Sequence, residues 1–169
     1  MRRADSRQAN WWYAVFSLTA LLVVAVDQLS KRWIRLYTDG QPIFEAGFFR
    51  ITHIQNTGAA FGLLQGHSFF LSIVDFIGIV LVLLFVFLVP RRFPLLDTKL
   101  AKLALGLILG GTVGNLIDRL RFGYVTDFIS IGIWPAFNVA DSALTVGVIL
   151  LACSLFCSTR AKKPFPPSS

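Results

Sequence analysis

The stretch "WPAFNVADSALTVGVILLACSLF", residues 134–156, combines a long apolar run with one carboxylate. From its fourth residue onward it is apolar enough to cross a membrane as a helix, which takes about 20 residues. Yet Asp141 lies near the beginning of this apolar run. Because an unpaired carboxylate is costly to bury, a residue of this kind at the edge of a membrane span requires a partner or a function.

The composition places the whole chain among membrane proteins. Of its 169 residues, 55% are hydrophobic and 15% are charged. Three further apolar stretches, residues 11–26, 69–89 and 100–117, join residues 137–157 to predict four transmembrane helices. The basic residues flank these stretches, which is typical of membrane topology and lipid headgroups. We therefore expect membrane lipids as partners and no nucleic acid.

The distribution of Lys and Arg predicts the orientation. Ten of them lie in the N-terminus, the 90–102 loop and the C-terminal tail, and six lie in the other connections. The larger set is expected in the cytoplasm. Both termini are then cytoplasmic, and residues 27–68 and 118–136 face the other side of the membrane.

The first outer segment has the composition of β-structure. Within residues 38–67, "GFFRITHIQ" is rich in aromatic and β-branched residues and predicts a strand or two. The tail, residues 158–169, is rich in Pro and Ser and is expected to be disordered. The predicted fold is a mainly α membrane protein. One domain, residues 1–157, would hold four transmembrane helices and a small extracytoplasmic β-sheet and loop region resting on the membrane.

Asp141 has a good structural explanation. Pro135 interrupts the chain, Asn138 is a suitable N-cap, and Asp141 then falls at the third position of the helix. This is a variant of the capping box, with a negative charge that suits the helix N-terminus. Taken alone, the pattern favours a cap.

A second aspartate changes that interpretation. Asp127 has apolar neighbours and precedes Asp141 by 14 residues, with Gly132 and Pro135 between them. If this segment folds back, the two carboxylates meet at the outer surface. Two close carboxylates share one proton, because both cannot ionise at neutral pH. One can then activate water while the other polarises a carbonyl, which is the chemistry of aspartyl proteases.

Other polar residues recur at helical spacing. Asp27 and Lys31 lie four residues apart, as an interfacial ion pair that could also brace a site. Asn115, Asp118 and Arg119 share one helix face and form either a polar shell or a local Asp–Arg pair. A stripe of small residues that would let another helix approach closely comprises Gly106, Gly110 and Gly114.

No other catalytic chemistry is indicated. His53 and His67 match no metal-binding pattern, and the sequence contains no nucleophile elbow or phosphate-binding loop. We expect no metal and no cofactor. The alternative function is a small proton-coupled transporter that uses intramembrane aspartates, including Asp75, as a relay. Such a relay needs carboxylates at several depths, and the sequence places none within the inner halves of the predicted spans.

Five motifs in order resemble the lipoprotein signal peptidases of bacteria (signal peptidase II). They cover nearly the whole chain and are "DQLSK" at 27–31, "NTGAAFG" at 56–62, "GGTVGNLIDR" at 110–119, "VTDFI" at 125–129 and "FNVADSA" at 137–143. The resemblance implies a membrane aspartyl endopeptidase. It would cut prolipoproteins on the amino side of a diacylglyceryl-modified cysteine, in the bacterial cytoplasmic (inner) membrane and near its outer face. We expect the enzyme to be a monomer. A non-catalytic assembly protein for lipoproteins is the other possibility.

The resemblance also assigns residues. The catalytic pair falls on Asp127 and Asp141, and we hypothesise that Asp127 holds the shared proton. Asp75 matches none of the motifs, and the sequence gives it no role. The residues expected to bind substrate or support the pair are Asp27, Lys31, Asn56, Gly58, Asn115, Arg119 and Asn138.

Overall fold

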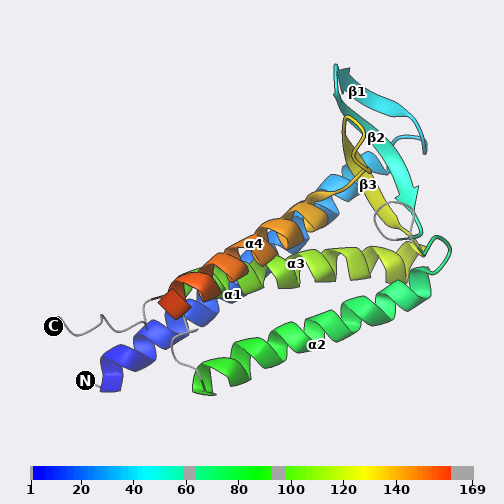
Figure 1. Ribbon diagram of the computed structural model, residues 1–169. Coiled ribbons are helices and arrows are strands. Elements are labelled where there is room, and N and C mark those ends of the chain that lie inside the picture. Colours follow the sequence, from blue (N-terminus) through cyan, green and yellow to red (C-terminus); the bar gives the residue numbers. More distant parts are fainter. Residues whose placement is uncertain (1, 59–63, 93–97, 161–169) are drawn as a thin grey trace.

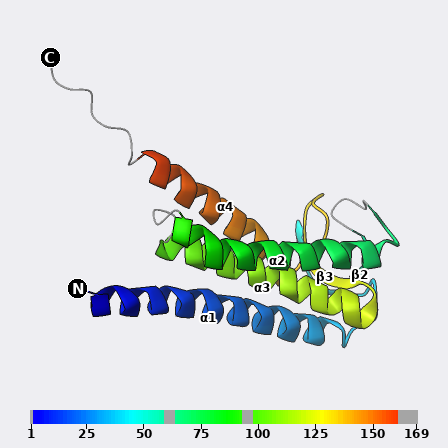
Figure 2. The ribbon, with the colours of Figure 1, turned by 90° about the horizontal axis from the view of Figure 1, so that it is seen from below.

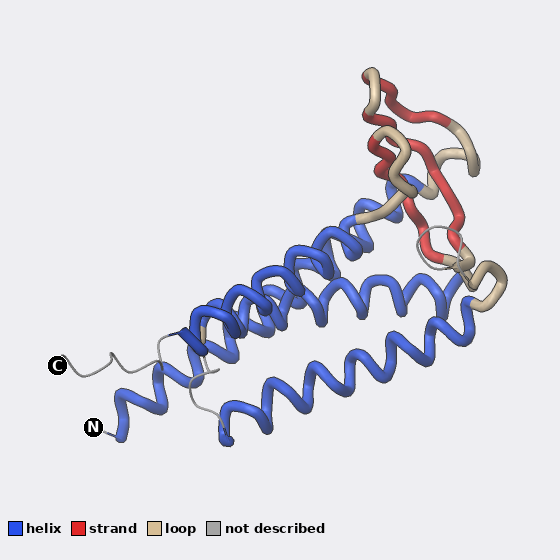
Figure 3. Tube along the Cα trace, in the orientation of Figure 1, coloured by secondary structure: helices blue, strands red, loops and turns tan. Residues whose placement is uncertain are grey.

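The computed structural model describes residues 2–58, 64–92 and 98–160 (Figure 1). Over these ranges the chain forms four helices, α1 (Arg2–Ile34), α2 (Ser68–Arg92), α3 (Lys99–Phe122) and α4 (Val139–Arg160). Three strands, β1 (Pro42–Ala46), β2 (Phe49–Asn56) and β3 (Val125–Ile131), gather at one end of the helices (Figure 3). Each helix contains a stretch long and apolar enough to cross a membrane. The predicted fold class is therefore confirmed.

Helix α3 is the centre of the bundle, because it packs against α1, α2 and α4 (Figure 2). Its glycines allow this. A Cβ atom added to Gly110 would lie 2.7 Å from Cβ of Val23 in α1. A Cβ atom added to Gly111 would lie 2.5 Å from the carbonyl oxygen of Ala140 in α4. Both distances are shorter than van der Waals contact, so the backbones can approach only where the side chain is hydrogen. The predicted packing role of the small residues is confirmed.

Helix α1 is longer than predicted. The expected span ended at residue 26, whereas the helix continues to Ile34. Asp27 and Lys31 thus lie inside the helix, where both are completely buried. The helix can carry these charges through its packed region because they pair with each other, with Nζ of Lys31 2.9 Å from Oδ2 of Asp27.

The other helix ends also differ from the prediction. Helix α3 continues past residue 117 to Phe122, where Gly123 caps it in the left-handed conformation with φ 78°. Helix α4 continues to Arg160, so the first residues of the predicted disordered tail are helical. The rest of that tail, residues 161–169, lies outside the described residues.

The sheet has the order β1-β2-β3, and both pairings are antiparallel. Strand β3 was not predicted, since the sheet was expected within residues 38–67. It comes from the connection between α3 and α4, and its first four residues are all buried. Strand β3 therefore lacks the alternation of apolar and polar residues that marks a half-exposed strand. Its register places Asp127 opposite Ile54 of β2.

The chain turns back directly after β3. Gly132 adopts φ 56°, a left-handed conformation that suits glycine. Phe137 and Ile129 then exchange backbone hydrogen bonds of 2.9 Å in both directions. The predicted fold-back is thus confirmed, and it brings Asn138 and the beginning of α4 beside β3.

Candidate active site

The first turn of α4 is closed by a reciprocal cap. The backbone N–H of Asp141 donates to Oδ1 of Asn138 at 2.9 Å. In return the backbone N–H of Asn138 donates to Oδ2 of Asp141 at 3.2 Å. The predicted capping box is confirmed. It fixes the position of the Asp141 carboxylate at the end of α4 that lies nearest the sheet.

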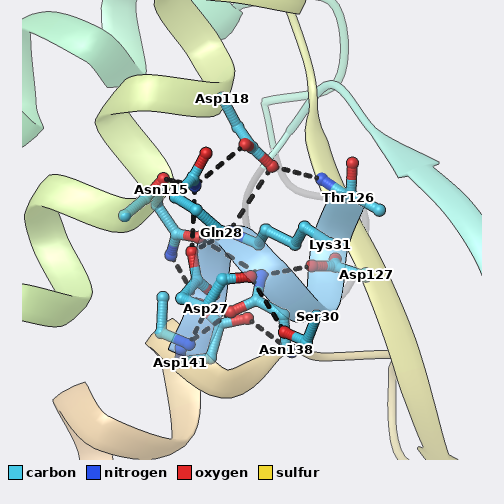
Figure 4. A network of polar contacts seen from close by, with 12 residues as sticks. Asp27, Gln28, Ser30, Lys31, Asn115, Asp118, Thr126, Asp127, Asn138 and Asp141 are labelled. Atoms are coloured by element: carbon cyan, nitrogen blue, oxygen red, sulfur yellow. Dashed lines mark hydrogen bonds and ion pairs between the residues drawn. The ribbon is translucent and has the colours of Figure 1, made fainter. Parts of the chain in front are cut away.

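The same asparagine also holds Asp127. Its Nδ2 donates to Oδ1 of Asp127 at 2.7 Å. The second oxygen, Oδ2, accepts from Nδ2 of Asn56 at 2.8 Å. Asp127 is 2% exposed. Asn138 therefore links the two aspartates directly, and Figure 4 shows them in one polar network.

Asn115 approaches Asp141 from α3. Its Nδ2 donates to Oδ1 of Asp141 at 2.8 Å. Its Oδ1 accepts from Nζ of Lys31 at 2.9 Å and from Nδ2 of Asn138 at 3.2 Å. Because an ammonium group can only donate, Lys31 fixes which end of the Asn115 amide faces the carboxylate. Lys31 of α1 thereby orients the Asn115 amide toward Asp141.

A buried ionic cluster anchors both segments that carry the aspartates. Lys31 lies 3.4 Å from Oδ2 of Asp118 as well as close to Asp27. Asp27 Oδ1 accepts from the backbone N–H of Ala140 at 3.0 Å, in the first turn of α4. Asp118 Oδ2 accepts from the backbone N–H of Thr126 at 3.0 Å, one residue before Asp127. The predicted Asp27–Lys31 pair is thus both an ion pair and a brace.

The surroundings of Asp127 favour its protonated form. Burial, and next the negative charge of Asp141, raise the pKa of Asp127 to about 7. The amide donors of Asn56 and Asn138 act in the opposite direction. Near neutral pH the proton that the two aspartates share can therefore reside on Asp127.

Arg119 has a partner that the sequence did not indicate. Its Nη1 donates to Oδ2 of Asp75 in α2 at 2.6 Å. Asp118, the next residue along α3, instead contacts Lys31 and Nη1 of Arg35, the latter at 3.4 Å. The alternative of a local Asp118–Arg119 pair is therefore wrong, because the two side chains reach different helices.

Both aspartates line an open pocket of about 760 Å³. Its polar end also includes side chains that the sequence singled out, namely Asn56, Asn115 and Arg119. Its apolar part follows α4 from Leu144 to Ile149. Among the described residues, no group of three or more His, Cys, Asp or Glu could hold a metal ion.

Gly58 is buried, lines the pocket and donates its N–H to Oδ1 of Asn56 at 2.9 Å. This contact orients the Asn56 amide, so its nitrogen faces Asp127. The rest of the "NTGAAFG" motif after Gly58, residues 59–62, lies outside the described residues.

Some residues of the network were missed by reasoning from the sequence. Gln28 donates from Nε2 to Asp118 at 3.2 Å and to the carbonyl of Gly114 at 3.0 Å. Arg35 donates to Oγ1 of Thr126 at 2.9 Å. Gln28 lies inside the "DQLSK" motif, which was the available signal. Arg35 could be found only once α1 was known to continue beyond residue 26.

A helix bundle that can cross a membrane, with two linked carboxylates in an open pocket, defines a class of membrane-embedded enzymes that use acid–base chemistry. Residues 19–157 match the family described as signal peptidase (SPase) II. The chain therefore belongs to the signal peptidase II family, and it is a peptidase of the aspartyl class.

Relatives and solved structures agree with this assignment. A lipoprotein signal peptidase of Dehalococcoides mccartyi (strain ATCC BAA-2266 / KCTC 15142 / 195) is 48% identical over 87% of this chain and 92% of its own. The lipoprotein signal peptidase of Moorella thermoacetica is 46% identical over 83% and 91%. A solved bacterial membrane enzyme superposes with a TM-score of 0.80 at 33% identity, covering 92% of this chain and 95% of that one.

Proposed function

We propose that this peptidase removes signal peptides from prolipoproteins, cutting before a diacylglyceryl-modified cysteine, and that Asp127 and Asp141 are its catalytic pair. The observation that carries the assignment of the pair is Asn138, which hydrogen-bonds to both carboxylates beside an open pocket. The substrate class follows from the relatives, which are named lipoprotein signal peptidases.

The first chemical step uses the two carboxylates differently. Asp141 acts as the base, since N–H donors from Asn115 and from the Asn138 backbone stabilise its negative charge. It takes a proton from a water molecule held between the carboxylates. The water oxygen bonds to the scissile carbonyl carbon, and Asp127 gives its proton to the carbonyl oxygen.

The second step reverses the proton flow. The tetrahedral intermediate collapses and breaks the C–N bond. Asp141 gives its proton to the leaving nitrogen, while Asp127 takes one back from the hydroxyl that becomes the new carboxyl group. The pair returns to its starting state with one shared proton. The raised pKa of Asp127, about 7, suits this return.

The shape of the pocket suits a lipid-anchored substrate. Leu144, Val148 and Ile149 line it along α4, beyond the two carboxylates. From Asp141 to Ile149 the helix rises by about 12 Å, at roughly 1.5 Å per residue. We infer that this apolar surface receives the acyl chains or the apolar part of the signal peptide. Arg119 and Asn56 at the polar end can donate to the substrate backbone.

The supporting residues position the pair. Asn115 and Asn138 orient the carboxylates, and Asp27 and Lys31 hold α4 and Asn115 in place. One chain supplies all of these groups, which supports a monomeric enzyme. We further propose cytoplasmic termini and a site near the outer face, because more of the described Lys and Arg lie toward the helix ends away from the sheet than toward the sheet (Figure 1).

The proposed function is tested with purified protein in detergent. Two versions of one prolipoprotein, with and without the diacylglyceryl group, are incubated with it, and release of the signal peptide is measured. We expect release from the modified version alone. Equal cleavage of both versions would contradict the proposed substrate, and no cleavage of either would contradict the proposed function.

A further inference from the structure

Asp75 is a carboxylate that the proposed chemistry does not use. It belongs to α2 and to none of the five motifs. Its side chain is 17% exposed, and its Oδ2 accepts from Nη1 of Arg119 at 2.6 Å. Such a short, largely buried contact between an arginine and a carboxylate is strong and directional. It ties the outer half of α2 to the end of α3 that carries the site.

The position of Arg119 gives this contact a consequence. Arg119 lines the pocket together with Asp127 and Asp141, whereas Asp75 does not line it. Arg119 therefore both contacts Asp75 and lines the pocket. It has five N–H donors, so one contact to Asp75 leaves others that can reach a substrate carbonyl.

The charge of Arg119 explains why its contact with Asp75 is needed. A guanidinium without a carboxylate of its own would be attracted to the two aspartates of the pocket. Close to them it would favour loss of the proton that the pair must share. The charged groups to consider are Asp75 of α2, which contacts Arg119, Asp127 of β3 and Asp141 of α4, which line the same pocket, and Lys31 of α1, whose charge acts on both Asp75 and Asp127. Of these three carboxylates, Asp75 alone does not line the pocket, and it is the one that contacts Arg119.

We propose that Asp75 is a positioning residue for the peptidase, which holds Arg119 against α2 so that the guanidinium faces the substrate and stays away from Asp127 and Asp141. This inference rests on the proposed function of the site. It predicts that Asp75 affects both substrate binding, through Arg119, and the pH range in which the pair works.

The test compares cleavage by Asp75→Asn, Asp75→Glu and Glu45→Gln across a range of pH. Glu45 is an exposed carboxylate of β1 and provides a matched control. We expect Asp75→Asn to lower kcat/KM by about tenfold or more, since it loses a charge-assisted contact. We expect the alkaline limb of its pH profile to move by about one unit to lower pH. Asp75→Glu should recover most of the activity, and Glu45→Gln should match the unaltered protein.

A second measurement separates positioning from a structural tie. In an Arg119→Gln background, followed under single-turnover conditions, Asp75→Asn should cause no further loss. Additive losses, an unmoved pH profile, or a fall in thermal stability alone would each overturn the inference. Failure of the proposed function is recognised separately, because the unaltered protein would then release no signal peptide, and failure of the proposed catalytic pair because Asp127→Asn and Asp141→Asn would then still cleave. If those two variants are inactive while Asp75→Asn behaves as the unaltered protein, the inference about Asp75 alone is wrong.

Discussion

At the scale of single residues, the site depends on three asparagine side chains whose amide groups are oriented by hydrogen bonds. Each of the three asparagines has a donor on its oxygen, which fixes the nitrogen toward a carboxylate. For Asn56 the donor is the N–H of Gly58, for Asn115 it is Lys31, and for Asn138 it is the N–H of Asp141. The two carboxyl groups of Asp127 and Asp141 can lie near each other here because fixed amide donors face them.

Asn138 both caps α4 with its side-chain oxygen and donates to Asp127 with its side-chain nitrogen, and a substitution can remove the second contact while keeping the first. Asn138→Ser retains an oxygen that can cap α4 but loses the amide donor to Asp127. Since Ser and Asn are similar as N-caps, the cap should be kept, and we expect a loss of about 1–3 kcal/mol from the unpaired Asp127 oxygen, smaller than the loss in Asn138→Ala. The cleavage rate should fall at least about tenfold. Both are measured on the same detergent preparation, with Asn138→Ala as a control that loses the cap as well. Unchanged cleavage by Asn138→Ser would contradict the role given to its amide.

The pKa of Asp127 predicts how stability depends on pH. Its folded value of about 7 lies above the ordinary 3.8. Between these two pH values the folded state binds more protons than the unfolded state, so stability falls as pH rises through this window. Asp127→Asn removes this contribution. Relative to the unaltered protein, the variant should therefore gain stability as the pH rises from about 4 to about 7, as measured by thermal unfolding. A difference that stays constant with pH would contradict the raised pKa.

The sequence predicted much of the site at this scale, and the limits have physical causes. The cap of Asn138 and Asp141 is local and could be derived from spacing alone. The partner of Arg119 could not be derived in this way, because Asp75 precedes Arg119 by 44 residues and belongs to another helix. Nothing in the local pattern distinguishes such a partner from a residue that faces lipid.

At the scale of elements, the site exists because α3 lies close to both α1 and α4. Gly114 illustrates the link between packing and chemistry, since a Cβ atom there would lie 2.6 Å from Oδ2 of Asp27. The small residue leaves room for the buried carboxylate that braces α4. Each helix overlaps one of the predicted spans, but α1 continues past residue 26, where its predicted span ended. Its continuation past residue 26 depends on buried partners in α3, which hydropathy does not report.

Strand β3 shows a different limit. The segment "VTDFISI" is rich in β-branched and aromatic residues and lies between Gly123 and Gly132, which is a usable signal. The signal was weak because nearly every residue of the strand is buried, so buried and exposed positions do not alternate. Its pairing with β2, from a distant part of the chain, then fixes Asp127 beside Asn56.

The glycines of α3 provide a test at this scale. Gly111→Ala would push a methyl group against the Ala140 carbonyl at 2.5 Å and separate α3 from α4. We expect a loss of stability of about 1–3 kcal/mol, as for overpacked cores, and reduced cleavage. The matched control is Gly78→Ala in α2, where the nearest atom, Cγ2 of Thr112, is 3.8 Å away. The control should be tolerated in thermal unfolding. Equal effects of the two substitutions would contradict the packing described for α3.

At the scale of the whole molecule, the sheet and the acidic residues of the network lie at one end of the helices. Helix α1 begins at the opposite end (Figure 1). Asp27, Asp118 and Asp141 all connect to backbone or side chains near the sheet. This one-sided arrangement suits a peptidase that meets its substrate at one membrane surface.

The orientation in the membrane is tested by cysteine labelling. In a background with Cys153 and Cys157 replaced by Ser, Glu45→Cys of β1 and Lys99→Cys at the start of α3 are compared in spheroplasts. A membrane-impermeant maleimide should label the first variant directly and the second only after permeabilisation. Labelling of Lys99→Cys alone in intact spheroplasts would reverse the proposed orientation.

We propose that Asp127 and Asp141 act as one catalytic unit, and this is tested by the rate at which Asp127→Asn and Asp141→Asn release the signal peptide from a modified prolipoprotein. Both variants should remain folded in detergent, and each should lose cleavage by a factor of about 10³ or more, because neither carboxylate can replace the other. Release at the unaltered rate by either folded variant would contradict the account.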